Sequence, residues 1–276
     1  MTIDLPRTAL LGVGSMSGSV LDGLLAAGLD PATVTLTTKS EGSAAAHRQR
    51  GLDATASDTD PDANRRAVRG AALVVVGVKP YMIADLLDEV AADLEPGAVL
   101  VSVAVGTTTA SMESRVPAGV RVVRALPNTP IGVGHGVTGV SAGASADPDA
   151  VALASSVFTA SGQVIEVPET QLDALSAVSG SGPAYVFLLV EEWQRAAEAL
   201  GFTPDQAATM VQGTLRGAVE LLDRSDREPA DLRRAVTSPK GTTERAVAVL
   251  QDADLADTFL RASRAAIARA EEIAAS

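Results

Sequence analysis

The chain contains no cysteine, so neither disulfide bonds nor thiolate metal ligands can contribute to its structure. Its two histidines leave little for a histidine-rich metal centre, and we expect no metal site. With 46% hydrophobic residues among 276, the chain can still bury a sizeable core and fold unaided. A chain without cysteine suits the reducing cytoplasm.

Basic charge, aromatic side chains and long apolar runs are also scarce. The formal net charge of −12 argues against nucleic acid and anionic membranes as partners, because both attract basic patches. Residues Met1 to Arg7 show no basic region followed by an apolar core, so we expect no secretory signal, and no apolar run reaches the roughly 20 residues of a membrane span. Aromatic residues make up only 3%, whereas Ala and Gly are abundant, which favours close helix packing over recognition on aromatic platforms. We therefore expect a soluble protein with small-molecule ligands.

The first strand pattern leads into a glycine turn. Thr8 to Val13 is a short apolar run, and Gly12-Val-Gly-Ser-Met-Ser-Gly18 opens a helical pattern. Two glycines permit close approach to a pyrophosphate, whose charge the N–H groups at the helix start would meet. The candidate contacts are Gly12, Gly14, Ser15 and Met16. Ser17 stands where a dinucleotide-binding turn usually has its third glycine, and a ligand-free turn is the alternative interpretation.

The second strand pattern, Val34 to Thr38, ends in hydroxyls and a cation. An NAD enzyme usually carries Asp or Glu there, which accepts a hydrogen bond from the ribose 2′-hydroxyl. This chain has Lys39 and Ser40 and no carboxylate before Glu41. A 2′-phosphate would suit these residues, so they predict NADPH as the cofactor, with NADH as the alternative. A solvated lysine in a loop is the other interpretation.

Three further apolar runs are typical of strands buried on both faces of a parallel sheet: Ala71 to Val78, Val99 to Val103 and Arg121 to Leu126. Open sheets of this kind bind ligands at the carboxyl ends of their strands. The residues at these ends are therefore candidate cofactor contacts, namely Val78, Lys79, Pro80, Ala104, Val105 and Asn128.

A last pair of strand patterns, Val137 to Ser141 and Val164 to Val167, flanks a helix that starts near Asp147 and completes the sheet. The fold class is α/β, with a Rossmann-like doubly wound sheet over residues 1–168. Residues 169–276 are expected to form an all-helical domain, because no strand pattern returns, and its apolar helix surface favours dimerisation. Within it, the pattern from Gly182 to Leu200 is apolar on most sides and predicts a central, buried helix.

The stretch from Ala177 to Phe187 separates the two patterns. Its Gly180, Gly182 and Pro183 suit an irregular backbone that ends in the first turn of a helix. Ser179 would then lie near free backbone N–H groups, which can hold an anion or a polar ligand. Ser179 is therefore a candidate substrate contact, and a plain capped helix start is the alternative.

Four motifs occur along the chain in this order: Val78-Lys-Pro80, Leu126-Pro-Asn-Thr-Pro130, Ser179-Gly-Ser-Gly-Pro-Ala-Tyr185 and Ala235-Val-Thr-Ser-Pro-Lys-Gly-Thr-Thr243. Together they resemble the pattern of the pyrroline-5-carboxylate reductase family, and the resemblance covers nearly the whole chain. It implies NAD(P)H as cofactor, a cyclic imine carboxylate as substrate and proline as product. It also implies an obligate homodimer able to assemble into a decamer.

The last motif departs from the family pattern at two positions. Lys240 replaces the first glycine of the usual Ser-Pro-Gly-Gly-Thr-Thr, and Ala235 stands where relatives often have Asn. Lysine tolerates a positive φ angle poorly, so the conformation of this loop is open. The loss of Asn removes a side-chain contact to the cofactor.

The same motif carries the expected substrate site. Backbone N–H groups of Gly241, Thr242 and Thr243 at a helix start can hold the substrate carboxylate in an otherwise acidic protein. The resemblance assigns the catalytic contact with the imine nitrogen to the Thr243 hydroxyl, and Ser238 is the next candidate. The alternative is that Thr242 and Thr243 only cap and pack the helix.

Other functions remain open at this point. A related hydroxyacid dehydrogenase would need a catalytic lysine on the helix Gly182 to Leu200, which contains none. An imine reductase that acts on analogous substrates is compatible with the sequence. Ketol-acid reductoisomerase needs converging carboxylates for magnesium, but Glu191 and Glu192 diverge by about 100° around a helix. From a different class, the chain could be an NADP-binding regulatory sensor without turnover, which would not consume NADPH.

Overall fold

The computed structural model describes residues 3–274 as parts of two compact units. The first unit comprises the described residues up to Pro183 together with those from Ala266 onward. The second unit is Ala184–Ala265. The expected domain boundary after residue 168 stays a prediction; residue 168 lies between the last strand and the helix that follows it.

Within the described residues, eight strands of the first unit form one sheet in the order β3-β2-β1-β4-β5-β6-β7-β8. Neighbouring strands are parallel except for the pair β6 and β7. The strands are β1 (Thr8–Leu11), β2 (Val34–Thr38), β3 (Asp53–Ala56), β4 (Leu73–Val76), β5 (Val99–Ser102), β6 (Arg121–Pro127), β7 (Gly136–Ala142) and β8 (Gly162–Glu166). The strand order reverses its direction of growth at β1 and β4, which confirms the doubly wound α/β prediction.

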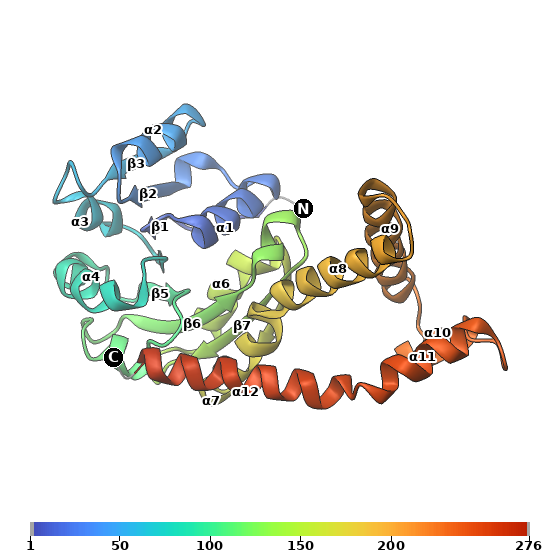
Figure 1. Cartoon of the computed structure of the whole chain (residues 1–276). Helices are drawn as coiled ribbons and strands as arrows, with labels where there is room; N and C mark the ends of the chain where they lie inside the picture. The colour runs from blue at the N-terminus through green and yellow to red at the C-terminus, as the bar shows by residue number, and fades with distance from the viewer. Residues whose placement is uncertain (1–2, 275–276) are drawn as a thin grey trace. The chain divides into compact units, whose positions relative to one another are not determined.

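Helices cover both faces of this sheet (Figure 1). The helices of the first unit are α1 (Ser15–Ala26), α2 (Glu41–Gln49), α3 (Ala63–Val68), α4 (Ile83–Val90), α5 (Thr109–Glu113), α6 (Pro148–Thr159) and α7 (Glu169–Leu175). Short 3₁₀ turns are η1 (Pro31–Thr33), η2 (Pro80–Met82), η3 (Ala91–Asp93) and η4 (Thr129–Val133). Helix α6 begins as expected, because Asp147 caps it by accepting a hydrogen bond from the Ala150 N–H at 2.8 Å.

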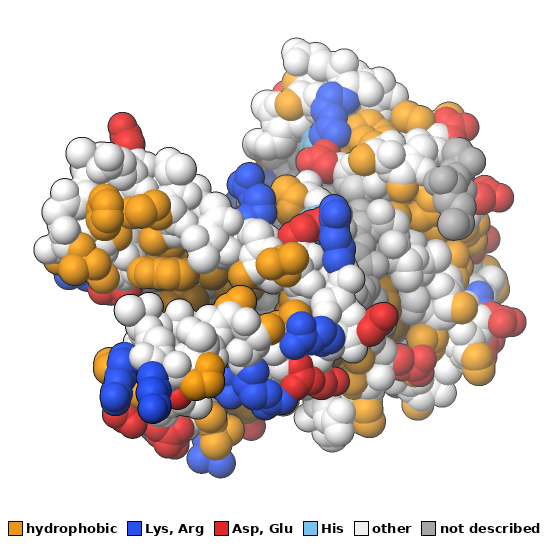
Figure 2. All heavy atoms as spheres, turned by 90° about the vertical axis from the view of Figure 1, so that its right-hand side faces the viewer, with side chains coloured by type: hydrophobic (Ala, Val, Ile, Leu, Met, Phe, Trp, Pro, Cys, Tyr) orange, Lys and Arg blue, Asp and Glu red, His pale blue; other side chains and the backbone are white. Residues whose placement is uncertain are grey.

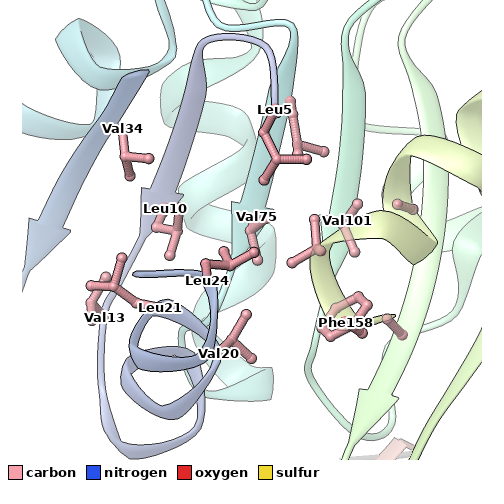
Figure 3. Packing of buried hydrophobic residues seen from close by; sticks show 14 of the residues in the cluster. Leu5, Leu10, Val13, Val20, Leu21, Leu24, Val34, Val75, Val101 and Phe158 are labelled. Atoms are coloured by element: carbon pink, nitrogen blue, oxygen red, sulfur yellow. The ribbon is translucent and has the colours of Figure 1, made fainter. Parts of the chain in front are cut away.

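The central strands β1, β4 and β5 are almost entirely apolar because alternate residues enter opposite cores. On β1, Leu10 packs into one core, whereas Ala9 and Leu11 pack into the other. The first core joins the sheet to α1 and α6, and Figure 3 shows Leu21, Leu24 and Phe158 within it. The second core joins the opposite face to α3, α4 and α5. A parallel sheet needs this two-sided cover, which explains the continuous apolar runs in the sequence.

Strand β3 has no counterpart in the sequence predictions. It pairs with β2, and its Ala54 and Ala56 are buried. Its sequence, Asp-Ala-Thr-Ala, is short and contains only one β-branched residue, so propensity gives little signal. The strand forms because its neighbour β2 offers a free edge, which is information that a local sequence pattern lacks.

The segment from Ala177 to Phe187 differs from the expected irregular loop and capped helix start. Residues Ser176–Gly180 form a π-helical turn, η5, in which the Ser181 N–H donates to the Ser176 carbonyl at 2.9 Å. This turn joins α7 to α8, so that a continuous helix runs over Glu169–Ala199. The predicted helix with Pro183 in its first turn is present as α8, which begins at Gly182. The irregular segment predicted ahead of it is wrong, because the π-helical turn takes its place and uses the Ser181 N–H.

The second unit is helical. Its elements are α8 (Gly182–Ala199), which begins at the end of the first unit, α9 (Pro204–Asp223), α10 (Pro229–Ala235), α11 (Thr242–Asp252) and α12 (Leu255–Ala274), which extends beyond it. Helix α9 begins with a capping box: the Gln206 N–H donates to the Thr203 hydroxyl, and the Thr203 N–H donates to the Gln206 side chain.

Helix α8 was predicted to be buried by neighbours, and in the single chain this is wrong, since Ala197 is its one buried residue among those described. Its large apolar side chains that are exposed include Val186, Phe187, Leu188, Leu189 and Trp193. By length and composition the helix Glu169–Ala199 would even suffice to cross a membrane, with 6% of its apolar window buried. Figure 2, which faces the side carrying α9 to α11, likewise shows apolar side chains open at the surface. Such exposure indicates surfaces that another molecule covers.

The loop before α11 keeps a left-handed residue in spite of its lysine. Lys240 has a φ angle of 59°, the conformation in which glycine is usual. Its N–H donates to the Glu244 carboxylate at 2.9 Å, and the Gly241 N–H donates to the Ser238 carbonyl at 3.0 Å. These two hydrogen bonds hold the turn although a left-handed lysine costs roughly 1 kcal/mol or more relative to glycine.

Candidate functional site

The glycine turn after β1 is tightly packed against the end of β4. Gly12 has a φ angle of 74°, and a Cβ atom added there would lie 2.3 Å from Val78 Cγ1. Thr37 on β2 fixes the turn, because its hydroxyl accepts the Gly12 N–H at 3.0 Å and its carbonyl accepts the Val13 N–H at 2.8 Å. Residue 12 must therefore be glycine on both conformational and steric grounds.

The start of α1 leaves its backbone donors open. Gly14 is the N-cap residue, and no side chain caps the helix there. The first turn contains no acidic residue. The first N–H groups of a helix lack partners within it, and the helix dipole adds positive potential at this end. Because a Cβ atom at Gly14 would meet nothing within 4 Å, an anion can approach these donors closely.

Ser17 stands where the usual turn has its third glycine, and Gly77 provides the space that its side chain needs. The Ser17 side chain is buried, and a Cβ atom added at Gly77, directly after β4, would lie 1.8 Å from its Oγ. In the usual turn, the third glycine allows the helix to pack closely on the strand. Here the gap is provided on the strand side, so α1 approaches β4 with Ser17 in place. Gly77 is not among the predicted site residues: it lies at the end of an apolar run, but its proximity to Ser17 arises only from the packing of α1 on β4.

A cleft of about 590 Å³ opens at the carboxyl ends of β1, β4 and β5. It brings together most of the predicted cofactor contacts, namely Gly12, Gly14, Ser15, Met16, Lys39, Val78, Lys79, Pro80, Ala104 and Val105. Other residues lining it that the sequence analysis did not single out include Ser19, Gly77, Met82, Val103 and Thr129. The cleft combines an anion-binding helix start, two lysines and apolar walls, and it fits a dinucleotide in size and chemistry.

A second hollow of about 410 Å³ adjoins this cleft and shares Gly12, Lys39, Val78 and Met82 with it. Its wall carries the carboxylates Asp58, Asp85 and Glu89, and Lys39 is the cation among its lining residues. Beside it, the hydrogen bond from Arg66 lowers the pKa of Asp60, so this carboxylate remains ionised and paired. Because Arg66 is paired with Asp60, Lys39 is the cation that an anion in this hollow would meet.

Two predicted cofactor contacts lie outside the lining of the cleft. Ser40 is the N-cap of α2, where its hydroxyl lies 3.1 Å from that of Ser43. Asn128 is buried next to Thr129 in the chain, and its amide bonds to the backbone of Ser179 and of Val137. Their roles as cofactor contacts remain predictions.

The predicted substrate residues Ser238, Gly241, Thr242 and Thr243 belong to the second unit. Gly241 is the N-cap of α11 and no side chain caps this helix, so Thr242 and Thr243 do not have the capping role of the alternative interpretation. Thr243 is half-buried in the first turn, and among the described residues none forms a hydrogen bond with its hydroxyl. The predicted role of the Gly241 N–H as a carboxylate donor is wrong in this conformation, because this group donates to the Ser238 carbonyl at 3.0 Å. The donors left at the helix start are the N–H groups of Thr242 and Thr243, beside the Thr243 hydroxyl.

Comparison with known families agrees with this arrangement. The model of the pyrroline-5-carboxylate reductase dimerisation family matches residues 169–273. The model of the family described as NADP oxidoreductase, coenzyme F420-dependent, matches residues 7–106. A dinucleotide-binding sheet followed by a helical dimerisation domain defines the class of two-domain NAD(P)-dependent oxidoreductases.

Individual relatives narrow this class. The pyrroline-5-carboxylate reductase of Pseudomonas aeruginosa is 36% identical over 270 residues, which cover 98% of this chain and 97% of the relative. That of Corynebacterium melassecola is 34% identical over 268 residues, covering 96% and 97%. The solved structure of the Coxiella burnetii enzyme superimposes with a TM-score of 0.90 at 37% identity and covers 98% of each chain. The chain belongs to the pyrroline-5-carboxylate reductase family.

The close approach of Ser17 to Gly77 can be tested by substituting first one residue and then both. Gly77→Ala should displace α1 from β4, lower the free energy of unfolding by about 1–3 kcal/mol and weaken NADPH binding. Adding Ser17→Gly should restore much of both losses, because it removes the colliding hydroxymethyl group. Urea unfolding and fluorescence titration with NADPH measure the two effects.

Gly18→Ala is the matched control, since a Cβ atom at this position meets nothing within 4 Å. It should leave NADPH binding unchanged. Equal effects of Gly77→Ala and Gly18→Ala would show that the close approach at residue 77 is unimportant.

Proposed function

We propose that the protein catalyses the NAD(P)H-dependent reduction of L-1-pyrroline-5-carboxylate to L-proline, the last step of proline biosynthesis. The observation that carries this proposal is similarity to pyrroline-5-carboxylate reductases over 96–98% of the chain. The cleft of the first unit and the Gly241-Thr242-Thr243 turn of the second supply the two binding chemistries that the reaction needs. The proposed setting is the cytoplasm.

The residues of the cleft hold and orient the cofactor. The N–H groups at the start of α1 receive the pyrophosphate, and the open space beyond Gly14 allows its approach. Val78, Pro80, Ala104 and Val105 form apolar walls at the strand ends. When bound, the reduced nicotinamide supplies a hydride, and the protein contributes orientation and exclusion of water.

The turn before α11 holds the substrate. The N–H groups of Thr242 and Thr243 bind the carboxylate, with the helix dipole supplying positive potential in an acidic protein. The Thr243 hydroxyl faces the imine nitrogen and stabilises it as this atom takes up its proton. Ser179 is a further substrate contact in this proposal. Piperideine carboxylates are close analogues, and they share both the carboxylate and the imine.

A regulatory sensor that binds NADPH without turnover is the second candidate. It would use the same cleft, so binding alone does not separate the two. The absorbance of NADPH at saturating pyrroline-5-carboxylate does, because an enzyme consumes the cofactor and a sensor leaves it unchanged. Stoichiometric formation of proline would complete the assignment.

Thr243→Val removes the hydroxyl and keeps the shape of the side chain. We expect kcat and kcat/KM to fall by roughly tenfold or more, because a hydrogen bond to a charged group contributes about 1.5–3 kcal/mol. The melting temperature should change little, since this hydroxyl caps nothing. Thr243→Ser should retain most of the activity. Turnover of the valine variant at the parent rate would remove the catalytic role, and Ser238→Ala would then be the next test.

We propose that NADPH is the preferred cofactor, with Lys39 as the partner of the 2′-phosphate. Lys39 faces both the cleft and the adjoining hollow, whose other charged lining residues are carboxylates. Glu41 does not oppose the phosphate as a free charge, because it forms an ion pair with Arg48. Ser40 and the start of α2 would add polar contacts.

Lys39→Glu should raise the KM for NADPH by at least about tenfold, because it replaces an ion pair with charge repulsion. The KM for NADH should change far less, since NADH lacks the 2′-phosphate. Lys39→Gln separates loss of attraction from added repulsion and should lie between the parent and the glutamate variant. Equal kinetics of the parent with both cofactors would refute the preference.

We propose that the covering partner of the exposed helices is a second copy of the chain, which gives a homodimer able to assemble further into a decamer. The match to the dimerisation family and the exposed apolar residues of α8 support this. Four consecutive exposed residues, Val186 to Leu189, point in different directions around α8, so one flat contact cannot cover them. Helices of the partner would interleave with this helix and complete the active site.

Phe187→Glu should convert the homodimer to a monomer with little activity, because a carboxylate would be buried in the interface. Light scattering at the assay concentration measures the mass. Val133→Glu is the matched control, since Val133 is 74% exposed and Phe187 68%, yet Val133 lies in the first unit. A parent protein that is active as a monomer would rule out the interleaved dimer.

A further inference from the structure

Pro183 leaves a backbone carbonyl of the preceding turn without its usual donor. In an α-helix the carbonyl of residue i accepts the N–H of residue i+4. For Ser179 that residue is Pro183, which has no N–H, and a proline ring also crowds the carbonyl four residues before it. The π-helical turn Ser176–Gly180 lies where this conflict falls, within the continuous helix Glu169–Ala199.

Asn128 supplies the missing donor. Its Nδ2 group donates to the Ser179 carbonyl at 3.0 Å, and its Oδ1 accepts the Val137 N–H at 2.8 Å. These two bonds fix which end of the amide is oxygen and which is nitrogen, because a carbonyl can only accept and an N–H can only donate. The side chain is buried, with 6% of the residue exposed, so solvent can hardly replace these bonds.

The position of Asn128 connects two parts of the proposed active site. It directly follows β6, and the next residue, Thr129, lines the cofactor cleft. Its partner Ser179 is the proposed substrate contact in the π-helical turn. The amide thus joins the wall of the cofactor cleft to a segment that touches substrate, while it does not itself line the cleft.

We propose that Asn128 is a positioning residue that acts through Ser179, in place of the cofactor contact that the sequence predicts. Its amide replaces the hydrogen bond that Pro183 cannot make and thereby fixes the turn that presents Ser179 to the substrate. Two of the four family motifs, around residues 128 and 183, are in this way halves of one structural unit. The kinetic consequence rests on the proposed function, whereas the structural coupling does not.

The structural coupling is measured by a double-mutant cycle on thermal stability. Asn128→Ala should lower the melting temperature by about 2–6 °C in the parent, because it leaves a buried carbonyl unsatisfied. Pro183→Ala restores an N–H at residue 183, so the same change should cost less than half as much in that background. Additive losses in the double variant would overturn the pairing of these two residues. This cycle needs no enzymatic activity.

The kinetic role is measured with Asn128→Asp, which keeps the acceptor for Val137 and loses the donor for Ser179. The KM for pyrroline-5-carboxylate should rise by about five- to tenfold, whereas the Kd for NADPH titrated without substrate should stay within about twofold. A raised Kd for NADPH with an unchanged substrate KM would make Asn128 a cofactor contact and overturn the proposal.

Thr109→Val is the matched structural control. The Thr109 hydroxyl donates to Glu169 Oε2 at 2.7 Å and anchors the opposite end of α7, away from Ser179. This variant should lose stability and keep the substrate KM of the parent. Equal KM effects of Thr109→Val and Asn128→Asp would mean that Asn128 acts only on stability, which also contradicts the proposal. A parent protein without turnover would refute the proposed function, and the stability cycle would still decide the pairing.

Discussion

A parallel sheet can persist only when both of its faces are covered, and this constraint organises the first unit. Successive residues of β1 and β4 enter two separate cores, which α1 and α6 complete on one side and α3 to α5 on the other. Because helices cover both faces of the sheet, a ligand can reach the sheet only at the ends of its strands. The cleft at the ends of β1, β4 and β5 follows from this geometry.

Close backbone approach then shapes the cleft. Gly12 meets Val78, and Gly77 makes room for Ser17, so the glycine turn of β1 and the end of β4 fit each other as a pair. A departure from the usual glycine pattern at residue 17 therefore leaves the helix start where a pyrophosphate needs it. The second unit uses the same principle in its uncapped turn before α11, where backbone groups are available beside Thr243.

Sequence patterns predicted the elements whose signal is local. The strands β1, β4 and β5 and the start of α6 near Asp147 were predicted, because burial on both faces and helix capping leave a pattern in neighbouring residues. Strand β3 depends on the free edge of β2, and the Ser179 carbonyl of η5 accepts a hydrogen bond from the distant Asn128 amide, so local patterns gave no sign of either contact. Most cleft residues were predicted from strand ends, but Gly77 and the buried position of Asn128 required the packing. The apolar pattern of α8 indicated burial without showing that the cover lies outside the single chain.

The uncapped start of α1 has a consequence for when the protein is stable. Its first N–H groups have no side-chain partner, so this edge of the fold is completed only when an anion binds. A ligand that binds the folded state alone adds stability according to its concentration, about 2.7 kcal/mol at one hundred times its Kd. The lifetime of the folded protein in a cell is thereby linked to the total supply of dinucleotide, because its oxidised and reduced forms carry the same pyrophosphate.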